Sequence, residues 1–276
     1  MNWTAGCGRI APSGECKLAT VCGAVIARDA AATLDRCLRS LAWADALLVV
    51  VDNRSADATA QIAGLHGARV EIRPFVDFAR QRNRALAMAQ EEWVLFVDAD
   101  EVVTPELADE VRAVTSVQQP AVSGYWIARK NILFGRWIRH AGWSPDYQLR
   151  LLRRADARYR EDRIVHELVD LRGEAGYLSS PLIHYNYSTF GEFCTRQRRY
   201  ASLEAANRYC QGIRIKPQNY LLQPWREFWR RYITLRGYRD GGLGLLLSAT
   251  LAYYEFITYV ELRSLWRKQG EAADRS

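Results

Sequence analysis

The sequence contains no C-x-x-C pair and no histidine at a zinc-finger spacing from any of its six cysteines. That absence argues against a structural zinc site and favours small buried or stray thiols in a reducing compartment. Residues 1–19 also lack the continuous apolar core that a secretory signal peptide needs. We therefore expect a loose N-terminal tail over residues 1–19 and a cytoplasmic protein.

Two further absences exclude whole classes of protein. The turn after the first apolar run reads A-R-D-A-A-A at 27–32, without the G-x-G-x-x-G that a nicotinamide dehydrogenase needs there. No zinc-finger or RNA-recognition signature is present, so we expect no nucleic-acid partner despite a formal net charge of +7. A surplus of that size favours other anionic partners, such as nucleotides and phospholipids.

Short apolar runs alternate with helical patterns over the first hundred residues. The runs predict buried strands at 20–26, 47–51 and 93–97, and residues 69–73 read as a further short strand. The helical patterns lie at 33–43, 55–66 and 79–89. Ser55 is placed to cap the second of these helices, and Gly67 suits its end. The alternation predicts an α/β fold with a mostly parallel, doubly wound sheet, in which ligands bind beyond the carboxyl ends of the strands.

The rest of the chain divides into two stretches of different composition. Residues 122–187 read as short, irregular extended segments rich in aromatic side chains. From Ser188 the pattern is helical and basic, with eleven Arg or Lys against three Glu between residues 190 and 239. We predict a catalytic domain over 20–187 and a helical, basic, membrane-proximal region over 188–276.

Two carboxylates follow the fourth predicted strand, at Asp98 and Asp100. Carboxylates this close repel one another and need a compensating cation. Mg²⁺ or Mn²⁺ takes oxygen ligands and is often held by one or two carboxylates together with substrate phosphates. The alternative is a solvated turn with Asp100 or Glu101 near the start of the helix that Thr104-Pro105 announces.

A third carboxylate, Asp52, ends the second predicted strand. It can accept hydrogen bonds from a nucleobase imide or a ribose hydroxyl, or it can belong to a turn that caps the next helix. The loop at 75–83 offers further polar groups for a nucleotide: Asp77, Arg80, Arg82 and Asn83. Charges at that spacing are also typical of a solvated helical face.

Several segments together resemble glycosyltransferase family 2, a family with a GT-A fold that uses nucleotide sugars with inversion. They read V-V-V-D-N-R-S-A-D at 49–57, R-Q-R-N at 80–83 and D-A-D-E at 98–101. Segments at 135–140, 142–152 and 165–167 are similar to the lipopolysaccharide core β-1,4-glucosyltransferase subfamily. The chain departs from the family at Asn53-Arg54, where many members have a small residue or Asp-Gly, and at Asp77, where the subfamily often has Gly.

The resemblance implies a function and roles for the strand-end residues. Asp52 would bind the nucleobase or ribose, Asp98 the ribose or metal, and Asp100 an Mg²⁺ or Mn²⁺ ion on the diphosphate. The metal would neutralise charge on the leaving nucleotide. The expected reaction moves glucose or a related hexose or heptose from a nucleotide sugar, expected to be a UDP-sugar, to a lipopolysaccharide-core or other glycolipid acceptor.

Inversion by direct displacement needs one general base for the acceptor hydroxyl. The candidate carboxylates downstream of the metal motif are Asp146, Glu161, Asp162 and Glu167. The resemblance places a functional pair at His166-Glu167, so Glu167 is the first candidate and Asp146 the second. Each of them also fits an ordinary surface salt bridge.

The basic C-terminal region interleaves aromatic and arginine side chains, as in Trp225-Arg226 and Trp229-Arg230. That pattern suits a surface lying on anionic lipid. Residues 241–260 carry one charge, Glu255, and are long enough to span a bilayer. The central Glu255 and three tyrosines favour an interfacial or packed helix instead.

We therefore expect a peripheral protein on the inner face of the cytoplasmic membrane, acting on a lipid-linked acceptor. The alternative is a non-catalytic GT-A-fold or membrane-surface scaffold protein. A scaffold would be expected to lose the metal carboxylates, and both Asp98 and Asp100 are present.

Overall fold

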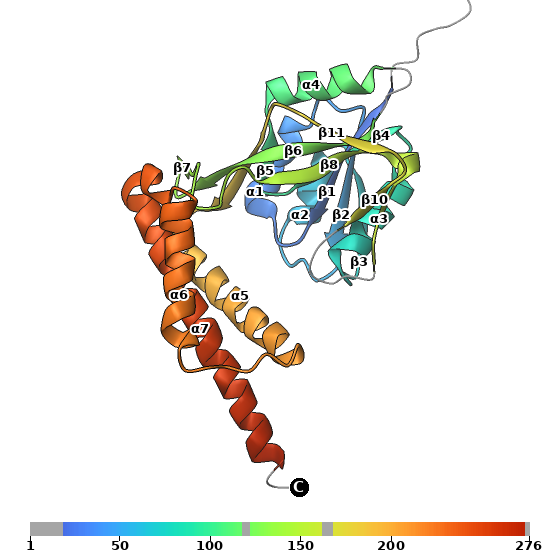
Figure 1. Cartoon of the computed structure of the whole chain (residues 1–276). Helices are drawn as coiled ribbons and strands as arrows, with labels where there is room; N and C mark the ends of the chain where they lie inside the picture. The colour runs from blue at the N-terminus through green and yellow to red at the C-terminus, as the bar shows by residue number, and fades with distance from the viewer. Residues whose placement is uncertain (1–18, 118–121, 162–167, 274–276) are drawn as a thin grey trace, which may run out of the picture.

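The computed structural model describes residues 19–117, 122–161 and 168–273 (Figure 1). The first four long strands form a parallel set in the order β3-β2-β1-β4. Their bounds are Val21–Ala27 for β1, Ala46–Asp52 for β2, Arg69–Arg73 for β3 and Trp93–Asp98 for β4. The sequence predicted all four strands to within one residue at each end.

Helices cover both faces of this parallel set, which is why β1, β2 and β4 are apolar on both sides. One core packs α1 (Ala31–Ser40), α2 (Thr59–Leu65) and α4 (Pro105–Thr115) against one face of the strands. A second core packs α3 (Phe78–Met88) against the other face. The predicted mostly parallel α/β architecture is confirmed.

The second half of the sheet is mixed. Beyond β4 the order continues β8-β6-β12-β5, with β8 (Tyr147–Arg153) antiparallel to β4 and to β6 (Val122–Leu133). The strand β12 (Leu182–Tyr187) runs parallel to β6, and β5 (Glu101–Val103) pairs antiparallel with β12. Two short strands, β7 (Arg136–Trp137) and β11 (Glu174–Tyr177), also pair with β6. The strands β9 (Ala157–Tyr159) and β10 (Val169–Leu171) form a separate antiparallel pair.

The reading of 122–187 as short, irregular segments was wrong for β6, which is a strand of 12 residues. Charged and amide side chains interrupt its apolar pattern at Arg129, Lys130 and Asn131. Two of these, Arg129 and Asn131, form buried or half-buried polar contacts instead of facing solvent. Alternation of apolar and polar residues therefore failed to mark the strand.

The predicted cap of the second helix was also wrong. The helix α2 begins at Thr59, and Ser55 instead accepts a hydrogen bond from the backbone N–H of Asp29 at 2.8 Å. The carboxylate of Asp57 accepts the N–H of Thr59 at 3.0 Å. The segment before α2 is therefore used to bind the loop after β1, and the helix starts later. Gly67 takes a φ of +70°, as its predicted place after the helix requires.

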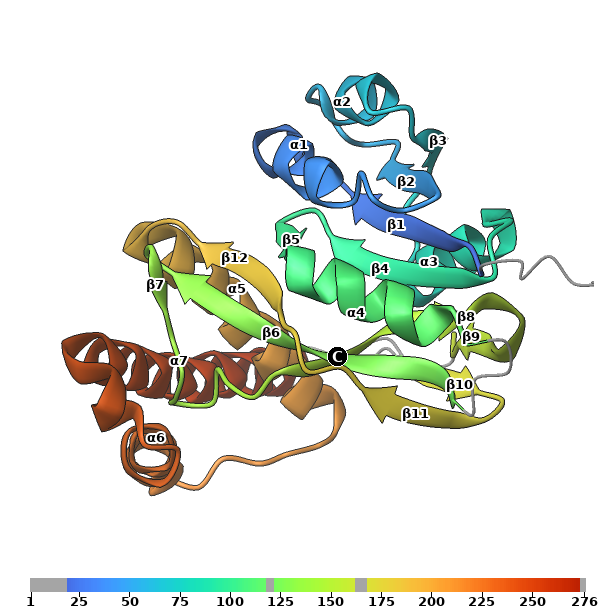
Figure 2. The same cartoon turned by 90° about the horizontal axis from the view of Figure 1, so that it is seen from above.

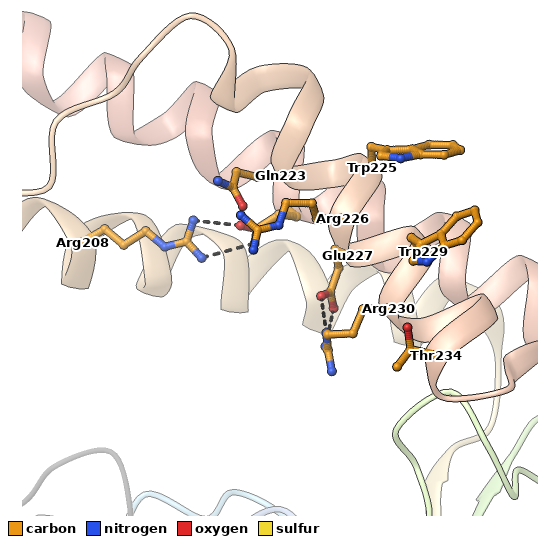
Figure 3. A pocket seen from close by; sticks show the side chains of 9 residues that line it. Arg208, Gln223, Trp225, Arg226, Glu227, Trp229, Arg230 and Thr234 are labelled. Carbon is orange, nitrogen blue, oxygen red and sulfur yellow. Dashed lines mark hydrogen bonds and ion pairs between the residues drawn. The ribbon is translucent and has the colours of Figure 1, made fainter.

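The chain after β12 is helical. It forms α5 (Phe190–Cys210), α6 (Asn219–Trp229), a π-helical segment at Arg230–Thr234, a 3₁₀ turn at Gly237–Asp240 and α7 (Gly241–Ala273). Figures 1 and 2 show these helices as a group beside the β7 and β12 end of the sheet. Phe193 and Leu247 pack there against Leu133, and the Arg208–Glu255 ion pair at 2.9 Å joins α5 to α7 (Figure 3).

We predict that Leu34→Ala destabilises the fold by about 2–5 kcal/mol, because Leu34 of α1 is fully buried in the first core. Leu65→Ala is the matched control, since Leu65 of α2 is 87% exposed, and it should change stability by no more than about 0.5 kcal/mol. Urea unfolding followed by circular dichroism measures both. Equal effects of the two substitutions would contradict the assigned core.

Candidate active site

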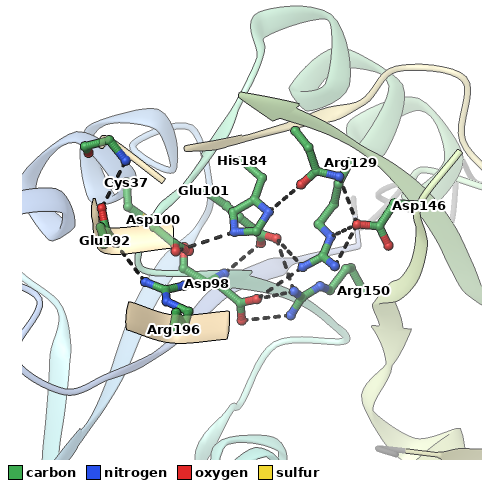
Figure 4. Close-up of polar contacts among 12 residues, drawn as sticks. Cys37, Asp98, Asp100, Glu101, Arg129, Asp146, Arg150, His184, Glu192 and Arg196 are labelled. Atoms are coloured by element: carbon green, nitrogen blue, oxygen red, sulfur yellow. Dashed lines mark hydrogen bonds and ion pairs between the residues drawn. The ribbon is translucent and has the colours of Figure 1, made fainter. Parts of the chain in front are cut away.

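The carboxyl ends of β1 and β4 open into a cavity of about 680 Å³, hereafter the strand-end cavity. Its wall includes side chains from β1, α3, β4, β12 and the first turns of α5. They include Arg28, Arg82, Asp98, Asp100, His184 and Arg196. Parallel α/β sheets place ligands at this edge, and the structure brings both carboxylates of the D-x-D segment to it (Figure 4).

Asp98 is surrounded by arginine. Its Oδ1 accepts hydrogen bonds from Arg150 Nη1 at 3.0 Å and Arg82 Nη2 at 3.2 Å. Its Oδ2 accepts another from Arg150 Nη2 and lies 4.0 Å from Arg129 Nη1. Burial alone would raise the pKa of Asp98, but these guanidinium groups outweigh it and hold that pKa well below its usual range. Asp98 is therefore an ionised carboxylate whose oxygens already have cationic partners.

Glu101 supports the same cluster from β5 and not from the start of a helix. It is fully buried, accepts the backbone N–H of Asp98 at 2.8 Å and lies 3.2 Å from Arg150 Nη2. Burial raises the pKa of Glu101. The solvated turn considered for this residue is thus excluded, because Glu101 holds the turn between β4 and β5 from inside the protein.

Asp100 faces a histidine that the sequence did not single out. The amide of Asn131 donates from Nδ2 to the carbonyl oxygen of Trp143 at 2.8 Å and to Asp146 at 3.1 Å, so its Oδ1 is an acceptor. His184 Nδ1 lies 2.7 Å from that Oδ1 and must donate to it. The other ring nitrogen, Nε2, then faces Asp100 Oδ2 at 3.5 Å.

These donor groups fit a divalent cation. Asp100, in the β4–β5 turn, and His184, on β12, point their carboxylate and imidazole Nε2 toward one another (Figure 4). The hydrogen bond from Nδ1 to Asn131 fixes the orientation of the ring, as hydrogen bonds to the other ring nitrogen of metal-binding histidines do. Within the described ranges no group of three or more His, Cys, Asp or Glu gathers as a metal site, so remaining positions would fall to substrate oxygens.

Asp52 is not among the residues that line the strand-end cavity. It is 3% exposed, with Arg54 Nη2 at 2.8 Å and Arg28 Nη1 at 3.6 Å. The hydrogen bonds from Arg54 lower the pKa of Asp52 to about 2. The guanidinium of Arg54 thus binds the carboxylate of Asp52, which the sequence predicted to bind a nucleobase or ribose.

The sequence predicted that four residues at the start of α3 contact a nucleotide, and the structure places them differently. Only Arg82 reaches the strand-end cavity. Asn83 donates to the carbonyl oxygen of Tyr159 at 2.8 Å and to Glu161 at 2.9 Å, and Arg80 Nε lies 3.3 Å from Glu161. Asp77 caps α3 by accepting the N–H of Arg80 at 2.7 Å, which explains an acidic residue where the resemblance favours glycine.

The general-base candidates differ in their surroundings. Asp146 accepts hydrogen bonds from Arg129, Asn131 and Gln148 at 2.8, 3.1 and 2.9 Å. Burial would raise the pKa of Asp146, but Arg129 and the two amides outweigh it and lower it. Glu161 is held by Arg80 and Asn83, whereas Asp162 and Glu167 lie outside the described residues.

A second cavity of about 560 Å³ lies next to the first. It shares Arg82, Asp98 and Arg129 with the strand-end cavity, and Trp126 and Gln148 line it as well. The arginine-bound Asp98 therefore forms the partition between two cavities, one at the ends of the parallel strands and one over the antiparallel strands.

The chain belongs to glycosyltransferase family 2. The model of that family, described as "Glycosyl transferase family 2", matches residues 24–168. The mostly parallel sheet flanked by helices, with its strand-end D-x-D segment, is a GT-A fold.

Individual relatives agree with the family. The chain is 26% identical over 244 residues to the lipopolysaccharide core biosynthesis glycosyltransferase LpsC of Rhizobium meliloti, covering 86% of this chain and 90% of LpsC. It is 25% identical over 251 residues to an uncharacterized glycosyltransferase of Rickettsia prowazekii, covering 87% and 86%. Among solved structures, S. aureus TarS in complex with UDP has a TM-score of 0.45 and 17% identity over 91% of this chain and 92% of TarS.

We predict that Asp146→Asn makes the free energy of unfolding depend less on pH in the acidic range. The pKa of Asp146 in the folded state lies below its usual value of about 3.8, so its stabilisation is complete above that pH and is lost as the pH falls below it. Urea unfolding between about pH 5 and pH 3 should show a steeper decline for the wild type than for the variant.

The control for that measurement is Asp109→Asn, a substitution on the exposed side of α4, where the side chain is 78% exposed. Its profile should run parallel to the wild type. An Asp146→Asn profile with the wild-type slope would show that the contacts of Asp146 do not hold its charge in the folded state.

Proposed function

We propose that the protein transfers glucose or a related hexose or heptose, with inversion, from a UDP-sugar to a lipopolysaccharide-core or other glycolipid acceptor. The observation that carries the proposal is the strand-end cavity, which joins Asp100 and His184 to the cationic side chains Arg28 and Arg196. A nucleoside diphosphate is complementary to such a site, because its phosphates need cations and its metal needs oxygen and nitrogen ligands.

Asp100 and His184 would hold a Mg²⁺ or Mn²⁺ ion. Their mixed oxygen and nitrogen set favours Mn²⁺, since Mg²⁺ takes oxygen ligands. The bound ion would supply charge neutralisation on the leaving nucleotide. The protein's own part is orientation: Asn131 fixes the tautomer of His184, and the cationic cluster fixes Asp98 beside the turn that carries Asp100. In this arrangement Asp98 acts on the ribose or through its arginines.

For the general base we propose Glu167, with Asp146 as the second candidate. A base must accept a proton, and a carboxylate with three donors and a lowered pKa accepts one poorly. Asp146 is better suited to hold Arg129 and Asn131, and through Asn131 to orient His184. A lipid-linked acceptor would place the enzyme at the inner face of the cytoplasmic membrane.

We expect isothermal titration with UDP and UDP-sugars to show binding that depends on Mn²⁺. Asp100→Asn and His184→Ala should each weaken that binding by about 10–100-fold, as loss of groups that hold or orient a metal does. Asp109→Asn should bind like the wild type. Tight binding that is unchanged by chelation of the metal would contradict the metal assignment. A folded protein that binds no nucleotide would favour the scaffold alternative.

We also expect Arg54→Ala to strengthen UDP binding by about two- to tenfold, the value of one or two hydrogen bonds regained by Asp52. The reason is that the nucleobase would no longer compete with Arg54 for that carboxylate. Asp52→Asn in the Arg54→Ala background should remove the gain. If Arg54→Ala instead weakens binding several-fold, Arg54 rather than Asp52 contacts the nucleotide.

A further inference from the structure

An apolar trough of about 530 Å³ runs between α6 and α7. Its wall is made almost entirely of aliphatic and aromatic side chains, including Leu221, Pro224, Trp225, Phe228, Tyr253 and Phe256. Leu221 is 81% exposed, Trp225 58% and Tyr253 55%. Soluble proteins rarely leave so many large apolar side chains exposed together unless something binds them.

A cationic cavity of about 710 Å³ adjoins this trough, and Trp225 lines both. Three arginines and two glutamates line it. Glu227 pairs with Arg230 at 2.8 Å and Glu255 with Arg208 at 2.9 Å. Across the described ranges Arg226 has no such carboxylate partner. Figure 3 shows Trp225 and Trp229 on the opposite side of α6 from Arg208.

The charge of the molecule is concentrated in the same helices. Residues 190–273 hold fourteen Arg or Lys against seven Asp or Glu, a surplus equal to the net charge of +7 of the whole chain. The remainder of the chain is therefore electrically balanced. An apolar trough, a neighbouring unpaired arginine and a local cationic surplus together match a partner with an apolar body and an anionic head.

We propose that α6 and the first half of α7 dock on the surface of an anionic lipid bilayer. The exposed side chains around Leu221, Trp225 and Tyr253 enter the outer hydrocarbon, and Arg226 meets the lipid phosphates. This deepens the proposed function by naming the surface through which the enzyme reaches a membrane. It rests on the proposed function in one respect, namely that the acceptor is linked to a lipid.

The helix α7 lies on the bilayer and does not cross it. One helix, Gly237–Gln269, passes the length and composition test for a membrane span. However, Glu255 in its middle is paired with Arg208 of α5, and α5 also carries Arg196, Arg198 and Arg199. A spanning α7 would carry this ion pair and its packed partner helix into hydrocarbon, at the cost of burying several charges there.

The helix α5 links the strand-end cavity to α7, which carries part of the docking surface. Arg196 and Tyr200 of α5 line that cavity, and Arg208 at the other end of the same helix contacts α7. A helix of 21 residues spans about 30 Å, so lipid contact and donor site lie within the reach of one rigid element. An acceptor sugar that projects from the bilayer would thus meet the cavity without leaving its lipid anchor.

The test is flotation of the full chain with vesicles of phosphatidylcholine, with and without phosphatidylglycerol, at low and high salt. We expect binding to the anionic vesicles that salt weakens. Leu221→Glu should lower the partition coefficient about tenfold or more, and Arg226→Glu about fivefold or more. The matched controls are Leu65→Glu in α2, 87% exposed, and Arg39→Glu in α1, with a side chain 73% exposed.

The proposal would be overturned if Leu221→Glu and Arg226→Glu bound anionic vesicles as well as the wild type does. It would also be overturned if the wild type did not float with anionic vesicles at low salt. Sedimentation equilibrium showing a dimer that Leu221→Glu dissociates would overturn it too, because the trough would then serve a second copy of the chain. UDP titration of the same variants separates the two proposals. Vesicle binding without nucleotide binding would sink the proposed function alone, and nucleotide binding without vesicle binding would sink the docking surface alone.

Discussion

The site depends on the ion pairs that the buried guanidinium of Arg150 makes with Asp98 and Glu101. It joins Asp98, the last residue of β4, to Glu101, the first residue of β5. In the sheet, β4 lies in the middle of the strand order, whereas β5 pairs with β12 at one end. The chain must therefore turn sharply between two strands that are not neighbours. The buried Arg150 holds that turn by pairing with the buried Glu101 and the partly exposed Asp98, and removing Arg150 would leave Glu101 without its closest cation.

A second polar chain ends at Asp100. It runs from Asp146 through Asn131 to His184, and it fixes which ring nitrogen faces the strand-end cavity. The two chains share Arg129, which lies beside both Asp98 and Asp146. The antiparallel strands β6 and β8 thus contribute the groups that orient the site, whereas the parallel strands contribute its carboxylates.

The sequence predicted the parallel half of the sheet well because three of its four strands, β1, β2 and β4, are short apolar runs that alternate with helical patterns. It did not predict β6, whose polar residues serve the site, nor His184, which is a lone histidine in a strand with no spacing to mark it. It placed Asp98 and Asp52 at strand ends but could not show that arginines occupy them. At Asp98, Arg150 and Arg129 come from strands far along the chain, and pairing register brings them there. At Asp52 the partner is Arg54, only two residues away.

In the function that we propose, Asp100 and His184 share one metal ion with a nucleoside diphosphate. Pulsed electron paramagnetic resonance of Mn²⁺ added with UDP tests it most directly, because an imidazole ligand couples its nitrogen to the metal spin. We expect nitrogen coupling in the wild type and its loss in His184→Gln. A spectrum of bound Mn²⁺ without nitrogen coupling in the wild type would contradict it.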